Sequence, residues 1–275
     1  MSEYLSELST AKKAAAEAAE VIRKYQRSNR FSVSFKGKND LVTDADIKAE
    51  ELILSIVKKN FPDDHILAEE SSDLSELPDG RTWLIDPIDG TTNFAHGFPI
   101  YCVSIALWEN GQPQMGLVLE VESNERYTAL AGKGAYLNGE PIRVSGLDDP
   151  RHALIGTGFP YNDLSLADNY LAFFKMLMEN TQGVRRPGAA SYDLCCVASG
   201  RFDGFYEYSL SPWDVGAAAL IVQEAGGIVT DWLGEDNWLF GERIIAGNPA
   251  VHSFLLDEVA NCFDESELKA IQRGE

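Results

Sequence analysis

The densest group of residues that could do chemistry is the segment Asp86-Pro87-Ile88-Asp89-Gly90-Thr91-Thr92. Pro87 biases Asp86 toward an extended backbone, so a strand can run to this carboxylate and stop there. Gly90 tolerates a positive φ, which allows a sharp turn after Asp89, and the two threonines that follow are good N-cap residues for a helical turn. The turn is predicted to bring the two carboxylates together beside backbone N–H groups and hydroxyls. Such a mixture of acceptors and donors suits a metal ion that holds a phosphate.

Three further acidic spots could converge on this turn from distant parts of the chain. Glu69-Glu70 ends the preceding predicted strand, Asp44-Ala45-Asp46 stands at a loop-to-helix junction, and Asp214 begins a helix much later. Mg²⁺ takes several oxygen ligands, so four or five carboxylates from separate loops form the inventory of a two- or three-metal phosphatase. For any single acid the alternative is structural, because an Asp at a helix start is commonly a cap and an acid beside another acid is commonly solvated.

The elements that must position these acids fall into two unlike halves. In the first half, helical spacing of apolar residues predicts amphipathic helices over 4–26 and from about 46 to 59. The polar, glycine-containing stretch Ser32–Asp40 is predicted to be a loop. From 101 to 144, short apolar runs separated by Asn-Gly and Gly-containing turns predict a meander of antiparallel strands.

After Arg151 strands and helices alternate, which is typical of an α/β arrangement. Strands are predicted at 152–156, 204–207, 228–230 and 244–246, and helices at 164–179, 189–199, 213–225 and 250–262. No repeat or long linker separates the halves. We therefore expect one domain over residues 1–275, with a soft internal boundary near 147–151.

The charge of the chain limits its partners. Forty-three acidic against 23 basic residues give a formal net charge of −20, which repels a polyanion at long range. The basic clusters are no longer than pairs, so a direct nucleic-acid role is not expected. The chain has no long apolar stretch and an acidic start, so no membrane association is expected and the cytoplasm is the predicted location. An acidic protein that handles a small anion needs cations at its site, and divalent metal is the simplest source.

Taken together, the motifs of this chain resemble those of the inositol monophosphatase family. The matching pieces are Asp40-Leu41-Val42-Thr43 with Asp46, Ala68-Glu69-Glu70-Ser71, Trp83 to Phe94, His96-Gly97-Phe98-Pro99, Gly188-Ala189-Ala190, Phe205-Tyr206-Glu207, Pro212-Trp213-Asp214 and Glu224-Ala225-Gly226-Gly227. They occur in family order over nearly the full chain. The acidic segment around Asp86 and the late segment around Asp214 are highly specific in combination.

The resemblance implies a role for each matching site residue. The first Mg²⁺ would be held by Glu69, Asp86 and the Ile88 carbonyl. The second would be held by Asp86, Asp89 and Asp214, and a third, weaker metal is expected near Glu69. The residues expected to act in catalysis are Glu69, Thr91 and Asp46, the last two as partners that position and help deprotonate the attacking water. Phosphate oxygens would be held by the backbone N–H groups of Gly90 and Thr91. The alcohol part of the substrate would contact Gly188, Ala189, Ala190 and Glu207.

The resemblance also implies a fold and an activity. The fold is a layered α-β-α-β-α sandwich of the inositol monophosphatase and fructose-1,6-bisphosphatase type, mixing α+β and α/β character. The activity is hydrolysis of a small sugar or polyol phosphate monoester, closest to myo-inositol monophosphate, with two or three Mg²⁺ ions per site. Many relatives are homodimers and are inhibited by Li⁺, so the chain is expected to share both properties.

Several alternatives remain open at this point. The wider superfamily includes fructose-1,6-bisphosphatases, histidinol-phosphate phosphatases and 3′-phosphoadenosine 5′-phosphate phosphatases. The stretch from Thr91 to Pro99 favours the inositol branch, and Glu207 offers acceptors for polyol hydroxyls. Ala189 stands where relatives often have Ser or Thr, and Arg185-Arg186 could reach a second phosphate or pair with the acidic surface. A binding or regulatory protein on the same scaffold would be expected to lose metal ligands, whereas all matching acids are present here.

Overall fold

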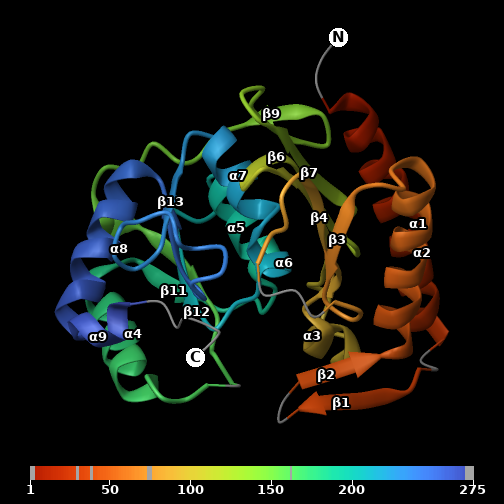
Figure 1. Cartoon of the computed structure of the whole chain (residues 1–275). Helices are drawn as coiled ribbons and strands as arrows, with labels where there is room; N and C mark the ends of the chain where they lie inside the picture. The colour runs from red at the N-terminus through yellow and green to blue at the C-terminus, as the bar shows by residue number, and fades with distance from the viewer. Residues whose placement is uncertain (1–3, 29–30, 38–39, 73–75, 162, 270–275) are drawn as a thin grey trace.

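Helices and sheets alternate in layers across the chain (Figure 1). The computed structural model describes residues 4–28, 31–37, 40–72, 76–161 and 163–269. Two helices cover one face of a large sheet, a second set of helices fills the space between this sheet and a smaller one, and a third set covers the far side. This order is the predicted α-β-α-β-α sandwich.

The larger sheet is the meander predicted for the first half, extended by two strands. Its strands in spatial order are β3 (His65–Ala68), β4 (Arg81–Asp89), β5 (Cys102–Glu109), β6 (Gln112–Glu120), β7 (Glu125–Leu130), β8 (Ala135–Leu137) and β9 (Glu140–Ile142). Strand β3 runs parallel to β4, and every later neighbour is antiparallel. Helices α1 (Leu5–Ser28) and α2 (Asp44–Asn60) pack on its outer face. A buried row of alanines on α1 lets that helix lie close.

The smaller sheet comes from the second half of the chain. Its strands in spatial order are β11 (Gly183–Arg185), β10 (Leu154–Thr157), β12 (Gly204–Tyr208), β14 (Arg243–Gly247) and β13 (Ile228–Thr230). Pairing with β10 is parallel and pairing with β14 is antiparallel. The outer face is covered by α4 (Ala167–Asn180) and α8 (Pro249–Cys262), with the short helices η1 (Pro150–His152) and α9 (Glu265–Leu268) beside them.

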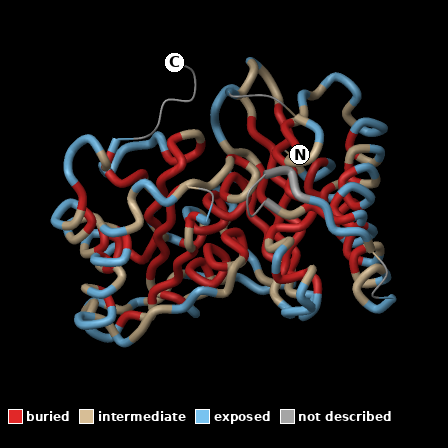
Figure 2. The backbone as a smooth tube through the Cα atoms, turned by 90° about the horizontal axis from the view of Figure 1, so that it is seen from below, coloured by how far each residue is buried: buried red, intermediate tan, exposed pale blue. Residues whose placement is uncertain are grey.

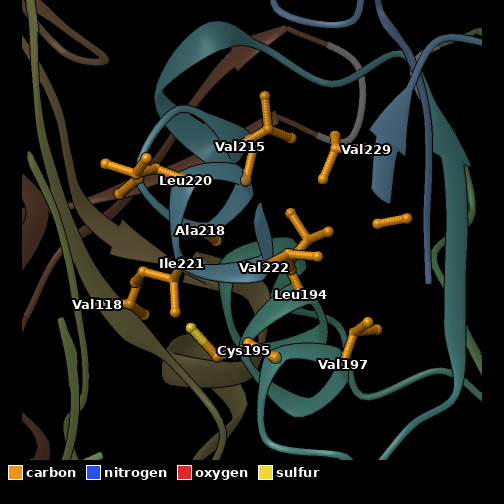
Figure 3. Close-up of a cluster of buried hydrophobic side chains, with 14 of the residues drawn as sticks. Val118, Leu194, Cys195, Val197, Val215, Ala218, Leu220, Ile221, Val222 and Val229 are labelled. Atoms are coloured by element: carbon orange, nitrogen blue, oxygen red, sulfur yellow. The ribbon is translucent and has the colours of Figure 1, made fainter. Parts of the chain in front are cut away.

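A central helical layer joins the two sheets. Helices α5 (Ala190–Ala198), α6 (Pro212–Val215) and α7 (Ala218–Glu224) lie between them. Figure 3 shows Leu194 of α5 beside Val222 of α7, and Cys195 of α5 directed toward Ile221 of α7 and Val118 of β6. Burial follows the layers, since the red backbone in Figure 2 runs through the sheets and the central helices. This core therefore draws on both halves of the chain.

Two local predictions are wrong. The predicted loop Ser32–Asp40 contains strand β1 (Val33–Gly37), which pairs antiparallel with β2 (Asp40–Thr43). The predicted helix from Trp213 to Ala225 is interrupted after α6. There the indole N–H of Trp108 donates to the Gly216 carbonyl oxygen at 3.3 Å, and an outside donor of this kind takes an acceptor that a continuous helix would use.

Among the described residues, no helix has the length and apolar character needed to cross a membrane.

Candidate active site

An irregularity in strand β4 puts the two central carboxylates on one face of the large sheet. Asp86 is paired with Ser104 and Asp89 with Cys102, so an advance of three residues along β4 is matched by an advance of two along β5. Ser104 and Cys102 share a face because side chains alternate along a strand, and their partners share it with them. The prediction that the strand stops at Asp86 is therefore wrong. The extra residue lies at a bulge, which also tolerates the missing N–H of Pro87.

Helix α3 (Thr91–His96) begins directly after this strand. Its N-cap is Gly90, with φ +96°, and Thr91 is the first helical residue, so the predicted threonine N-cap is wrong. The positive φ and a close approach both favour glycine here. A Cβ at Gly90 would lie 3.1 Å from the Ile100 carbonyl oxygen. The turn thus brings the start of α3 against the carboxylate-bearing strand.

The structure brings Thr91 and Asp46 together across 45 residues of sequence. The Thr91 hydroxyl Oγ1 lies 3.0 Å from Asp46 Oδ1 and 3.0 Å from the Ile88 carbonyl oxygen. Asp46 is the third residue of α2, and its Oδ2 accepts the Thr43 backbone N–H at 2.9 Å in a capping box. Burial raises the pKa of the Asp46 carboxyl, which makes it a stronger proton acceptor once ionised.

Four acids from separate elements act on one another at this site. Burial raises the pKa of Asp86 well above its ordinary value, and the negative charges of Glu69, Asp89 and Asp214 raise that pKa further. Glu69 follows β3, where its N–H donates to the Ile85 carbonyl oxygen at 3.1 Å. Asp214 is held in the first turn of α6, its Oδ2 accepting the N–H of Ser211 at 2.7 Å.

This set of groups fits a hard divalent cation in its chemistry. The donors are carboxylate oxygens, which Mg²⁺ prefers, and a bound cation would offset the repulsion that raises the pKa of Asp86. Among the residues that the structure describes, no three His, Cys, Asp or Glu side chains are drawn together tightly enough to enclose an ion. Binding would therefore require these carboxylates to come closer together.

Asp89 is anchored by the central helix α5. Its carboxylate accepts the backbone N–H groups of Ala190 at 3.2 Å and Ser191 at 2.7 Å, and the Ser191 hydroxyl at 2.5 Å. Burial raises the pKa of Asp89 while these hydrogen bonds oppose the rise. Ser191 was not among the residues predicted for the site. Nothing in the sequence pairs it with an acid 102 positions earlier.

A pocket of about 130 Å³ opens beside this anchor. It is lined by Asp89, Gly158, Arg186, Gly188, Ala189, Ala190, Glu207, Leu210 and Asp214. The four residues expected to contact the alcohol part of the substrate therefore share one wall with two of the expected metal ligands. Asn93, which the sequence did not single out, ties this wall to α3, because its Nδ2 donates to the carbonyl oxygens of Ile100 at 2.8 Å and Pro187 at 2.9 Å.

Glu207 is a buried acid of this pocket. Burial raises its pKa to about 8, while the positive charge of Arg186 acts in the opposite direction. Gly158 leaves the room that the carboxylate occupies, since a Cβ there would fall 1.8 Å from Glu207 Oε1. Gly158 thus lines the pocket although the sequence reasoning did not place it there.

The layered α-β-α-β-α sandwich is also the fold of solved inositol monophosphatase structures. The inositol monophosphatase from Anabaena superposes on this chain with a TM-score of 0.84 and 38% identity, covering 95% of this chain and 98% of that one. The profile of the inositol monophosphatase family matches residues 4–264. The chain belongs to the inositol monophosphatase family, which confirms the predicted family and fold.

Other similar proteins carry a different kind of name. A protein of Neisseria meningitidis serogroup B named "Putative Nus factor SuhB" is 48% identical over 250 residues, covering 90% of this chain and 96% of its own length. The "Nus factor SuhB" of Pseudomonas aeruginosa is 44% identical over 257 residues, covering 92% and 95%. These proteins similar to this chain are thus named either as inositol monophosphatase or as Nus factor.

Proposed function

We propose that this chain hydrolyses a small phosphate monoester, with myo-inositol monophosphate as its substrate, in a Mg²⁺-dependent reaction. The observation that carries the proposal is the convergence of acids from separate elements, with Asp86 and Asp89 on one face of the large sheet and Asp214 beside Asp89 in the pocket. Burial raises the pKa of Asp86, and the negative charges of Glu69, Asp89 and Asp214 raise it further. Four buried or half-buried acids at one site are costly for a fold unless a cation offsets their charge. Membership of the inositol monophosphatase family supports the same reading.

The expected ligands divide into two overlapping sets, which share Asp86. Glu69 and the Ile88 carbonyl complete the first set, and Asp89 and Asp214 complete the second. When bound, Mg²⁺ would neutralise the phosphate, lower the pKa of a water molecule and stabilise the leaving oxygen. The backbone N–H groups of Gly90 and Thr91 would hold phosphate oxygens.

Thr91 and Asp46 would act on the attacking water. The Thr91 hydroxyl donates toward Asp46 Oδ1 at 3.0 Å, which leaves an Oγ1 lone pair to accept a hydrogen bond from water and orient it. The water oxygen forms a bond to phosphorus while the bond from phosphorus to the alcohol oxygen breaks. The water proton can pass through Thr91 to Asp46. The alcohol oxygen takes a proton from solvent as it leaves, and Asp46 returns its proton to solvent. One ester and one water thus give one alcohol and one inorganic phosphate.

Glu207 would recognise the alcohol. Its carboxyl lies in the pocket on the same wall as Ala189 and Ala190, and it can accept or donate hydrogen bonds to vicinal hydroxyls. Ala189 contributes no hydroxyl, so this position offers the substrate only backbone groups, and Glu207 supplies a side-chain acceptor on the same wall.

The test is phosphate release with Mg²⁺ from inositol 1-phosphate, fructose 1,6-bisphosphate, histidinol phosphate and 3′-phosphoadenosine 5′-phosphate. We expect the inositol ester to be hydrolysed, EDTA to abolish the reaction and Li⁺ to inhibit it. Asp86→Asn should remain folded and lose roughly 10³-fold or more in rate. A folded Asp86→Asn variant with most of its activity would overturn the site assignment, and silence on every ester would overturn the function.

A second candidate role comes from the names of the relatives, and it needs no catalysis. Proteins 48% and 44% identical to this chain are named "Putative Nus factor SuhB" and "Nus factor SuhB", so we propose a Nus-factor role as the second function. The test is a P. aeruginosa strain that lacks SuhB, supplied with this chain or with Asp86→Asn. If both proteins restore the function that the strain lost with SuhB, the Nus role does not depend on the Asp86 carboxylate. If only the unmodified chain restores that function, the Nus role depends on Asp86. If neither protein restores it, the proposed Nus role is wrong.

We also propose that the chain forms one catalytic domain and a homodimer. The shared core of the two halves supports a single domain. Exposed apolar side chains at Leu164 (62% exposed), Leu171 (55%) and Met178 (61%) lie on and before α4, which would favour covering by a second copy. Light scattering should give twice the chain mass. A measured mass equal to that of one chain would contradict the homodimer.

A further inference from the structure

Arg186 lies on the wall of the candidate active site, and the reaction proposed above does not use it. Its guanidinium carbon is 5.2 Å from the centroid of the Tyr161 ring and 6.0 Å from that of Phe159. Stacking on aromatic rings fixes a planar guanidinium without consuming its N–H donors. Arg186 is therefore held in place with its hydrogen-bonding edge available.

Only Gly188 separates this guanidinium in space from the turn at Gly90, which is expected to hold phosphate. Nη1 of Arg186 is 2.8 Å from the position that a Cβ at Gly188 would take. The carbonyl oxygen of Gly188 is in turn 3.3 Å from the corresponding position at Gly90. Because Gly188 contacts both, a substrate whose phosphate lies at Gly90 could reach Arg186 with its far end.

Arg186 is also the basic residue of a pocket that is otherwise acidic. Among the described residues that line it, the other ionisable side chains are Asp89, Glu207 and Asp214. Arg186 makes no hydrogen bond or ion pair with a described residue, so no carboxylate in the described part of the chain occupies its N–H donors. Its charge still reaches the pocket, since it opposes the rise that burial causes in the pKa of Glu207.

The neighbouring Arg185 provides a natural contrast. It ends strand β11, its Nη1 donates to the Val184 carbonyl oxygen at 3.0 Å, and it does not line the pocket. Both arginines are exposed. The sequence alone could not separate the two, and the structure assigns only Arg186 to the site.

We propose that Arg186 binds a second anionic group on the alcohol part of the substrate, so that the site favours phosphate monoesters carrying a further phosphate. This inference rests on the proposed phosphatase function and extends its substrate class from polyol monophosphates to sugar bisphosphates. A guanidinium presents paired N–H donors that match two phosphate oxygens. A neutral polyol offers only hydroxyls to the same donors and gains less from them.

The test compares fructose 1,6-bisphosphate with fructose 1-phosphate, which differ only in the second phosphate. For each, kcat/KM is measured with Mg²⁺ for the unmodified chain, Arg186→Ala, Arg186→Lys and the matched control Arg185→Ala. We expect the unmodified chain to favour the bisphosphate and Arg186→Ala to lower that preference by roughly 10- to 100-fold, the range of a charge-assisted hydrogen bond. The loss should lie mainly in KM, and Arg186→Lys should restore part of the preference.

Each contrary outcome has a distinct meaning. An equal preference in the unmodified chain and Arg186→Ala, or an equal loss in Arg185→Ala, would overturn the role of Arg186 and leave the phosphatase function standing. If the unmodified chain hydrolyses neither of these esters nor inositol 1-phosphate, the proposed function fails, and this inference fails with it.

High salt gives a supporting measurement. If it lowers the preference of the unmodified chain for the bisphosphate as Arg186→Ala does, the preference depends on a charge interaction.

Discussion

Ser191 donates two hydrogen bonds to the carboxylate of Asp89, from its backbone N–H at 2.7 Å and from its hydroxyl at 2.5 Å. The two residues belong to different halves of the chain, Asp89 to the end of β4 and Ser191 to the first turn of α5. This contact fixes the orientation of one expected metal ligand from the opposite side of the site. It also couples the bulge in the large sheet to the central helical layer.

The Ser191 hydroxyl should therefore tune metal affinity. Ser191→Ala keeps the backbone bond and removes the hydroxyl bond, and loss of such an orienting partner typically costs 10- to 100-fold in metal affinity or activity. We expect the Mg²⁺ concentration for half-maximal rate to rise by roughly 10-fold. Ser199→Ala is the matched control, because that hydroxyl bonds the Cys195 carbonyl oxygen just beyond the other end of α5. An unchanged Mg²⁺ dependence in Ser191→Ala would show that the backbone donors suffice.

The hydroxyl of Thr91 should be needed for the chemical step. Thr91→Val keeps the shape of the side chain and removes the group that links water to Asp46, so kcat should fall by roughly 10²- to 10⁴-fold, as for loss of proton transfer. Thr91→Ser should keep most of the rate. Thr92→Val, at the exposed neighbouring position, is the control. If Thr91→Val turns over normally, water must be activated elsewhere.

Part of this site follows from local sequence. The segment from Asp86 to Thr92 was predicted to bring two carboxylates together, and they do share a face of the sheet. The mechanism differs, since the strand continues past Pro87 and a bulge restores the common face. A proline is compatible both with a strand end and with a bulge, so the sequence could not choose between them.

Other parts depend on contacts that no local pattern encodes. Asn93 and Ser191 act through partners 94 and 102 positions away, and their placement depends on how the two sheets pack. Glycine at 158 is needed only because Glu207 comes to lie against it. The contrast between Arg185 and Arg186 likewise depends on which of them faces Tyr161. Long-range packing, rather than propensity, decides each case.

Gly158 should tolerate no side chain without loss of the alcohol pocket. An alanine Cβ would fall 1.8 Å from Glu207 Oε1 and 2.1 Å from its carboxyl carbon, so Glu207 must turn away. Gly158→Ala should raise KM by roughly 10-fold through lost hydrogen bonds and destabilise the fold by about 1–3 kcal/mol. Gly146→Ala is the matched control, since a Cβ there meets nothing within 4 Å. Equal KM values for the two variants would contradict the role given to Glu207.

The buried carboxyl of Glu207 should make stability depend on pH in a defined direction. Its pKa is raised from an ordinary 4.5 to about 8 by burial, so the folded chain keeps a proton between these values that the unfolded chain releases. Stability from this group is therefore fully present below pH 4.5 and is lost as pH rises through 8.

Glu207→Gln cannot ionise and should not show this loss. We expect the difference in unfolding free energy between the variant and the unmodified chain to change across pH 4.5–8 and to be level on either side. Urea unfolding in EDTA measures it without bound metal, whose charge would lower the pKa of Glu207. Adding Mg²⁺ should shrink the difference if the cation binds near this carboxyl. Parallel stability curves for the two proteins in EDTA would mean that Glu207 is already ionised in the folded chain at neutral pH, with Arg186 as the cation that compensates it.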